Sequence, residues 1–168
     1  NAALTDEEYY EVIRAKTSLL FAVSSSLGAM ISKSGETIQK ALHDYGLHVG
    51  NAFQLIDDAL DYCSDAQTIG KNIGDDLADG KATLPLLHAL KYGTPAQQLK
   101  IRESLGKGTL QYLPEILEAI ASTNAIDYTR NAAAKEVDKA ISALQILPDS
   151  VYKETLADIA RYALKRDH

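Results

Sequence analysis

The sequence predicts an all-α protein, and three observations lead to this fold class. Apolar residues recur at spacings of three and four along most of the chain, which is the period of an amphipathic helix. Alternating β-branched and aromatic residues, the pattern of a half-buried strand, are almost absent. Residues that favour helix starts and ends recur between the periodic segments. With 168 residues, 46% of them hydrophobic, the chain can bury one core and requires no second domain.

The first predicted helix runs from Thr5 to about Ile31. Thr5 and Glu8 have the spacing of a capping box, in which each side chain accepts a hydrogen bond from the backbone N–H of the other residue. Lys16 and Thr17 then lie near the middle of this helix. Taken alone, Lys16 is more readily explained as a surface lysine than as a functional residue.

The second predicted helix extends from its N-cap, Ser34, to about Tyr62, a length of roughly 40 Å. Its apolar residues follow one another at spacings of three and four and predict a buried stripe. The stripe consists of Ile38, Leu42, Tyr45, Val49, Ala52, Ile56 and Leu60. The acidic residues near the end of the helix are expected on the opposite side.

Residues 64–82 are predicted to form a long loop, because three glycines and many charges interrupt the helical pattern there. Shorter helices are expected at 83–92, from 95 to just before Gly106, and at 114–122. Asn124 is predicted to cap a longer helix to about Ile146. A last helix follows the break at Pro148 and ends near residue 165.

Charge and cysteine content limit the partners and the compartment that we expect. A net charge of -6 and a pI of about 5.2 argue against nucleic acid or an anionic membrane surface as the main partner. Cys63 is the only cysteine, so the sequence predicts no disulfide framework and a reducing, cytoplasmic setting. No apolar run approaches the ~18 residues that a membrane span needs.

The strongest functional signal is the acidic cluster of Asp57, Asp58 and Asp61, with Gln54 one helical turn before it. No Lys or Arg occurs from residue 41 to residue 70, so the cluster needs a cation from outside the chain. Carboxylate oxygens at this spacing suit Mg²⁺. The alternative is a solvated helix face. Such faces normally mix charge signs, however, and the helix macrodipole disfavours acids at a C-terminal end.

The predicted loop adds a second acidic run and two Gly-Lys pairs. Residues 75–79 repeat the D-D-x-x-D spacing outside any predicted helix, and only Asp75 is expected to act. Gly70-Lys71 and Gly80-Lys81 would let the backbone approach an anion while an ammonium contacts it. The loop is therefore a candidate diphosphate clamp. It is no P-loop, because Ala82 stands where a Ser or Thr should follow the lysine.

The order of these motifs along the chain resembles that of the trans-isoprenyl diphosphate synthases, and most closely that of the bacterial octaprenyl and polyprenyl members. Phe53-Gln54 running into Asp57-Asp58-x-x-Asp61 is similar to the second aspartate-rich region of that family. The segments Gly70-Lys71-x-x-Gly74-Asp75 and Gly80-Lys81-x-Thr83-Leu84-Pro85 follow it as they do in the family. Lys16-Thr17 resembles the Lys-Thr pair of the preceding helix.

The resemblance implies a Mg²⁺-dependent prenyltransferase that condenses an allylic prenyl diphosphate with isopentenyl diphosphate inside a helical bundle. It implies metal-binding roles for Asp57, Asp58, Asp61 and Asp75. It implies contacts with the allylic diphosphate for Lys16, Lys71 and Lys81. It also implies that Thr17 and Gln54 direct their oxygen atoms at the allylic cation and that Phe53 lines its site. Catalytic roles then fall to Lys16, Thr17, Gln54, Asp57 and Lys71.

The resemblance further implies that residues 1–168 are the C-terminal portion of a synthase domain. The first aspartate-rich region and the isopentenyl diphosphate site of the family have no counterpart in this sequence. We therefore expect a missing N-terminal half and, as is typical of the family, a homodimer. A half-bundle should expose an apolar face unless the missing helices or a second subunit cover it.

Two other functions remain open from the sequence. A class I terpene cyclase or squalene-type synthase shares aspartate-rich helices but usually lacks the Gly-Lys loop. A non-catalytic subunit of a heteromeric prenyltransferase would keep the fold, but it has no physical need for an uncompensated carboxylate cluster.

Overall fold

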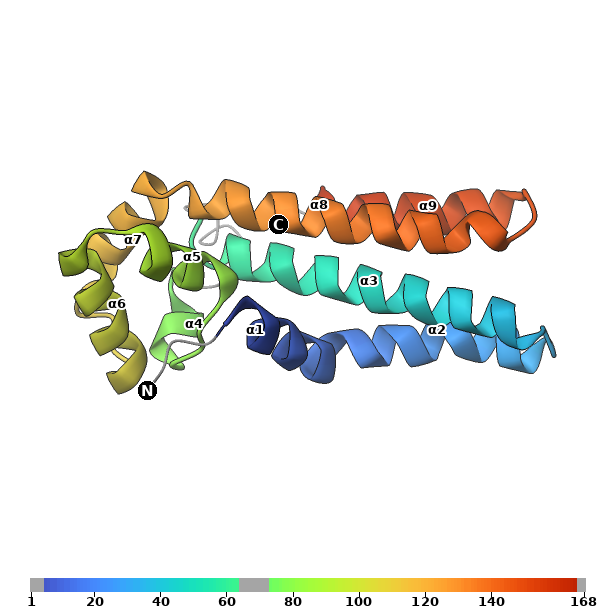
Figure 1. Ribbon diagram of the computed structural model, residues 1–168, viewed down its shortest axis with the longest axis horizontal. Helices are drawn as coiled ribbons and strands as arrows, with labels where there is room; N and C mark the ends of the chain where they lie inside the picture. The colour runs from blue at the N-terminus through green and yellow to red at the C-terminus, as the bar shows by residue number, and fades with distance from the viewer. Residues whose placement is uncertain (1–4, 64–72, 166–168) are drawn as a thin grey trace. The chain divides into compact units, whose positions relative to one another are not determined.

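The computed structural model describes residues 5–63 and 73–165, and within those ranges it contains helices and no strand, which confirms the all-α prediction (Figure 1). The helices are α1 (Asp6–Ile13), the π-helix η1 (Arg14–Ser18), α2 (Leu19–Ile31), α3 (Glu36–Leu60), α4 (Asp75–Ala78), α5 (Leu84–Tyr92), α6 (Pro95–Lys107), α7 (Leu113–Ser122), α8 (Ala125–Ala143), the 3-10 helix η3 (Leu144–Ile146) and α9 (Val151–Leu164).

The described residues fall into two compact units. Of the described residues, 5–9, 57–63 and 73–131 form the first unit, and 10–56 and 132–165 form the second. Helices α1, α3 and α8 each contribute residues to both units.

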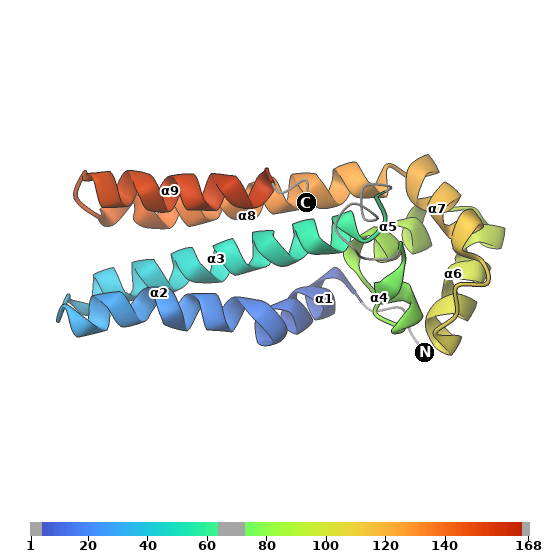
Figure 2. The same ribbon diagram turned by 180° about the vertical axis from the view of Figure 1, so that it is seen from behind.

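In the second unit, the π-helix η1 and α2 lie alongside α3, and α9 folds back along α8 (Figure 2). Two glycines of α3 allow the close approach. A Cβ atom added at Gly50 would lie 2.6 Å from Ser18 Cα, and one added at Gly46 would collide with the backbone carbonyl of Phe21. Any larger residue at either position would push these helices apart.

In the first unit, α5, α6 and α7 enclose an apolar core together with the start of α8 and part of the α4 region. The buried residues of this core are Tyr62, Leu77, Leu86, Ala89, Leu90, Ile101, Ile116, Ala119, Ile120 and Ala125. Gly108 ends α6 in the left-handed conformation, at a φ of 60°. The predicted end before Gly106 is therefore wrong, because only Gly108 adopts the conformation that stops a helix.

Most predicted helix boundaries agree with the structure to within a few residues, and the differences have local causes. The capping box is confirmed, since Thr5 N–H donates to Glu8 Oε2 at 2.7 Å and Glu8 N–H to Thr5 Oγ1 at 3.2 Å. The second helix begins at Glu36, and the hydroxyl of Ser34 lies 2.9 Å from that of Ser32, so the predicted cap is wrong. The first predicted helix contains an unforeseen π-helical turn.

The first predicted helix also exposes a series of large apolar side chains, as expected for a half-bundle. They are Val12, Leu19, Leu20, Val23, Leu27, Met30 and Ile31. Among the residues that the structure describes, no helix is both long enough and apolar enough to cross a membrane.

Candidate active site

The end of α3 holds its acids inside the first unit. The side chains of Asp58 and Asp61 are each only 3% exposed, whereas Asp57 is partly exposed. Ala59 and Leu60 are buried as well, so this end of α3 is covered on several faces, and the acids are buried although they were predicted on the side opposite the apolar stripe. A solvated helix face is thereby excluded for Asp58 and Asp61.

Each of these two buried carboxylates has an identified donor from elsewhere in the first unit. Tyr9 Oη donates to Asp58 Oδ2 at 2.6 Å, and the N–H of Asp76 donates to Asp61 Oδ2 at 3.3 Å. Buried carboxylates need such donors, because a buried polar group without a hydrogen-bond partner costs about 1–3 kcal/mol of stability and a charged group costs more. The donors also fix how the two carboxylates are turned.

The acidic run after Gly74 is held against the same helix end. Gly74 has a φ of 83°, its N–H donates to the carbonyl of Asp61 at 3.0 Å, and an added Cβ would lie 2.9 Å from Leu113 Cδ1. Glycine is therefore favoured there by its left-handed backbone conformation, whereas the leucine side-chain ends near it could shift to admit a Cβ. Asp75 and Asp76 begin the short helix α4, which lies inside the segment predicted to be a loop.

Lys81 lies at the end of this segment and pairs with two of its acids. Its Nζ lies 2.9 Å from Asp76 Oδ1 and 2.8 Å from Asp79 Oδ2. Hydrogen bonds to Asp79 and then to Asp76 raise the pKa of Lys81 above its usual range. Asp76 thus links Lys81 to Asp61, whereas the sequence led us to expect that only Asp75 of this run would act. Gly70 and Lys71 lie outside the described residues.

A buried tyrosine that the sequence did not single out lies next to these acids. Tyr62 is 6% exposed and Thr83 Oγ1 donates to its hydroxyl at 3.5 Å. Burial raises the pKa of Tyr62, and the carboxylates of Asp61, Asp76 and Asp58 raise it further, so the phenol stays protonated.

The second unit contains the remaining described residues that were predicted to be functional. Thr17 lies in the π-helix η1 and its hydroxyl donates to Gln54 Oε1 of α3 at 2.8 Å. Lys16 precedes it and is exposed. The rings of Phe21 and Phe53 lie with centroids 5.6 Å apart and tilted by 40°. Single π-helical turns inside α-helices are often found at functional sites.

The second unit also contains a chain of polar side chains that sequence reasoning missed. Ser18 donates to Asn51 Oδ1 at 2.6 Å, and Asn51 Nδ2 donates to Glu136 Oε2 at 2.7 Å. The ring Nδ1 of His48 lies 2.8 Å from the same carboxylate oxygen, and Lys139 donates to the other oxygen at 2.6 Å.

The pKa of Glu136 is lowered to about 2 by this chain. Burial alone would raise it, but the hydrogen bonds from His48, Lys139 and Asn51 outweigh burial. A signal was present in the sequence, because Glu136 is three residues from Ala133 and four from Ala140, both buried on α8. A charged residue at an apolar spacing of a helix is typical of a buried polar contact.

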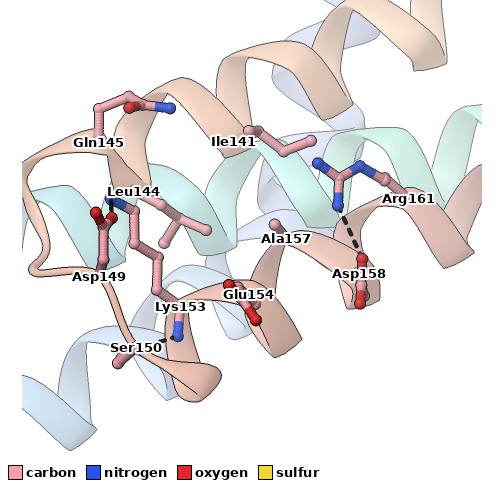
Figure 3. A pocket seen from close by; sticks show the side chains of 10 residues that line it. All are labelled: Ile141, Leu144, Gln145, Asp149, Ser150, Lys153, Glu154, Ala157, Asp158 and Arg161. Atoms are coloured by element: carbon pink, nitrogen blue, oxygen red, sulfur yellow. Dashed lines mark hydrogen bonds and ion pairs between the residues drawn. The ribbon is translucent and has the colours of Figure 1, made fainter.

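A groove between α8 and α9 is lined by none of the residues predicted to be functional (Figure 3). Charged side chains surround it, with Arg161 paired to Asp158 at 2.8 Å and Lys153 to Asp149 at 3.0 Å. These pairs are the ordinary i to i+3 and i to i+4 contacts of a helix and the turn before it.

The carboxylates of the first unit provide the oxygen ligands that a divalent cation prefers. Within residues 5–63 and 73–165, no group of three or more His, Cys, Asp and Glu side chains is arranged to hold a metal ion. Mg²⁺ is commonly held by one or two carboxylates together with substrate phosphates and water. The residues present fit such a shared site rather than a closed protein cage.

Comparison with known proteins places this geometry in a family. The chain is 45% identical over 165 residues to the octaprenyl diphosphate synthase of Escherichia coli K12, covering 98% of this chain and 51% of that protein. It is 41% identical over 162 residues to an all-trans-nonaprenyl-diphosphate synthase of Rhodobacter capsulatus, covering 96% and 50%. The crystal structure of a polyprenyl synthase from Caulobacter crescentus CB15, complexed with calcium and isoprenyl diphosphate, superposes with a TM-score of 0.92 at 39% identity, covering 100% and 52%.

The family model described as "Polyprenyl synthetase" matches residues 1–121. The chain therefore belongs to the polyprenyl synthetase family, which confirms the resemblance inferred from its motifs. It spans about half the length of the relatives that it matches.

Proposed function

We propose that the complete protein containing this chain is a polyprenyl diphosphate synthase, which joins an allylic prenyl diphosphate to isopentenyl diphosphate. The observation that carries the proposal is the end of α3, where Asp58 and Asp61 of the D-D-x-x-D motif are buried and oriented by donors. Family membership supports the same activity, since octaprenyl and nonaprenyl diphosphate synthases are among the relatives.

This chain would supply one wall of the site. Asp57, Asp58, Asp61 and Asp75 would hold Mg²⁺ together with the substrate diphosphate. The calcium in the related Caulobacter structure supports a divalent cation in the family but does not identify it as magnesium. Lys16, Lys71 and Lys81 would contact the allylic diphosphate, and Phe53 would line the site of the allylic chain.

Breaking the allylic C–O bond places negative charge on the departing diphosphate. When bound, Mg²⁺ neutralises part of that charge. The lysine ammonium groups of this chain act in the same direction, because they interact more strongly with the departing diphosphate than with the bound ester. Lys81 would exchange one of its two carboxylate partners for a diphosphate oxygen.

The allylic cation left behind requires electron-rich neighbours. Because the proton of the Thr17 hydroxyl is directed at Gln54 Oε1, the lone pairs of Thr17 Oγ1 point away from that bond. They would stabilise a cation bound next to Thr17. The double bond of isopentenyl diphosphate then attacks the cation, and the released diphosphate accepts the proton that is lost.

We further propose a cytoplasmic homodimer in which the missing N-terminal half supplies the opposite metal-binding wall and the isopentenyl diphosphate site. The apolar side chains exposed along the first predicted helix support such a cover, because isolated soluble units rarely expose so long an apolar face.

Asp57→Asn in the full-length protein tests the proposed function. The substitution keeps the shape of the side chain and removes its charge, so kcat for prenyl transfer should fall by roughly 100-fold or more while the melting temperature changes little. Asp44→Asn is the matched control, because Asp44 lies on the same helix and pairs only with side chains near the surface. An unchanged kcat in Asp57→Asn would remove this residue from the reaction.

A further inference from the structure

We infer that the buried chain of Glu136, Asn51 and Ser18 is a positioning device that holds the π-helical turn, and with it Lys16 and Thr17, in register with α3. The inference deepens the proposed function and rests on it for the roles of Lys16 and Thr17. All the contacts that support it lie within the second unit.

Two neighbouring hydrogen bonds join the π-helix η1 to α3. Ser18 bonds to Asn51 at 2.6 Å, and Thr17 bonds to Gln54 at 2.8 Å. Ser18 and Thr17 are consecutive, and Asn51 and Gln54 are three residues apart on one helix. The two bonds are therefore mechanically coupled, and fixing the first fixes the second.

Of these two hydrogen bonds, the one between Ser18 and Asn51 is anchored by its buried surroundings. Ser18 and Asn51 are 0% and 1% exposed, and Gly50 leaves no space around the Ser18 backbone. Asn51 is itself held, because its amide donates to the ionised carboxylate of Glu136, and hydrogen bonds to charged groups are about twice as strong as neutral ones. Since Nδ2 of Asn51 is committed to Glu136, its Oδ1 is presented to Ser18 as an acceptor.

The Thr17 bond, by contrast, lies only partly buried at the proposed site. A π-helical turn is intrinsically less favourable than an α-helical one and persists where surrounding contacts enforce it. Here the enforcing contacts are the anchored bond and the close approach at Gly50. Loss of the anchor would let residues 14–18 relax towards ordinary helix, which would turn Lys16 and Thr17 relative to Gln54.

Ser18→Ala and Asn51→Leu in the full-length protein test the inference by two readouts. Amide hydrogen exchange of residues 14–18 should become about tenfold faster, because the local structure opens more easily. The kcat for prenyl transfer should fall about tenfold or more with a smaller change in KM for the allylic substrate, as expected when catalytic groups are misplaced. Ser18→Ala is the milder change and covers the case in which Asn51→Leu fails to fold.

Two control variants separate positioning from general loss of stability. Leu144→Val removes one buried methylene group from the same unit, so it should lower the melting temperature while leaving kcat and the exchange of residues 14–18 unchanged. Lys40→Met removes an exposed lysine of α3 in the same unit, which pairs with Asp44 and not with the buried chain, and it should also leave both readouts unchanged.

Unchanged exchange at residues 14–18 in Ser18→Ala would overturn the inference, and so would an equal fall of kcat in Leu144→Val. If the unaltered full-length protein shows no prenyl transfer, the proposed function fails instead. The exchange measurement still decides in that case whether the anchor holds the π-helical turn.

Discussion

Each of the two units buries acidic side chains, and they do so in different ways. In the first unit, Asp58 and Asp61 accept hydrogen bonds from a tyrosine hydroxyl and from a backbone N–H. In the second unit, Glu136 is bonded by an imidazole, a carboxamide and an ammonium group, and its pKa is lowered to about 2. Three donors thus share the one carboxylate of Glu136. In the first unit, one donor each orients the carboxylates of Asp58 and Asp61, which belong to the D-D-x-x-D motif.

This contrast gives a way to distinguish acids that stabilise the fold from acids that take part in the reaction. The charge of Glu136 is compensated by partners within its own unit, so its removal should appear as lost stability, together with the loss of turnover expected when the π-helical turn is no longer held. We expect the charge of the D-D-x-x-D motif to be used by a cation and a diphosphate, so its removal should appear mainly as lost turnover.

The largest expected effect is a complete loss of prenyl transfer by the isolated 168-residue chain. One wall of carboxylates cannot hold the diphosphate and cation in a productive geometry if the other wall and the isopentenyl diphosphate site are absent. Incorporation of radiolabelled isopentenyl diphosphate should be at background for the chain and robust for the full-length protein under identical conditions. Turnover by the chain, free of longer protein, would contradict the proposed half-site.

The next largest effect is the pH dependence of the contribution of Glu136 to stability. Its folded-state pKa of about 2 lies below the ordinary 4.5, so its ionised form stabilises the fold at any pH well above 4.5. This contribution, about 3 kcal/mol, is lost as the pH falls from about 4.5 towards 2. Urea unfolding of the full-length protein and of Glu136→Gln should therefore differ most at pH 7, and the difference should shrink steadily below pH 4.5 and approach its minimum near pH 2.

The comparison of the two proteins cancels other acids that titrate in the same range. A difference in unfolding free energy that stays constant from pH 7 to pH 3 would show that the charge of Glu136 is not what stabilises the second unit. Glu136 would then no longer differ from the D-D-x-x-D acids as a residue whose charge stabilises the fold.

Features that depend on neighbours in sequence could be predicted well. The Thr5 and Glu8 capping box follows from a four-residue pattern, and it is present as expected. The helix start at Thr94-Pro95 is confirmed in the same way, with Gln97 completing a capping box. The end of that helix was misplaced by two residues, because two glycines occur there and their φ angles cannot be read from the sequence.

Features that depend on contacts far apart in the chain could not be predicted. The π-helical turn arises where Ser18 meets Gly50, thirty-two positions later, and no local pattern encodes it. The burial of Asp58 depends on Tyr9, which is distant in sequence. The motif itself identified the acids of the site, but the donors that orient them became apparent only from the fold.

The smallest expected effect is that of replacing Tyr9 in the first unit. Its hydroxyl donates to Asp58 Oδ2 at 2.6 Å in a buried setting, so Tyr9→Phe should lower the free energy of unfolding by about 1–2 kcal/mol. If Asp58 also serves the cation, the Mg²⁺ concentration for half-maximal activity should rise, because the carboxylate is no longer held in one orientation. Tyr152→Phe is the matched control, since the Tyr152 side chain is 79% exposed, and it should change neither quantity.

A double-mutant cycle with Asp58→Asn then measures the pair directly. A coupling free energy of about 1 kcal/mol in stability is expected if the hydrogen bond is the main interaction that Tyr9→Phe removes. Additive effects would mean that Tyr9 stabilises the first unit through packing alone. In that case Asp58 would be oriented by other contacts, and the view that the fold presents this carboxylate in a fixed direction would lose its main support.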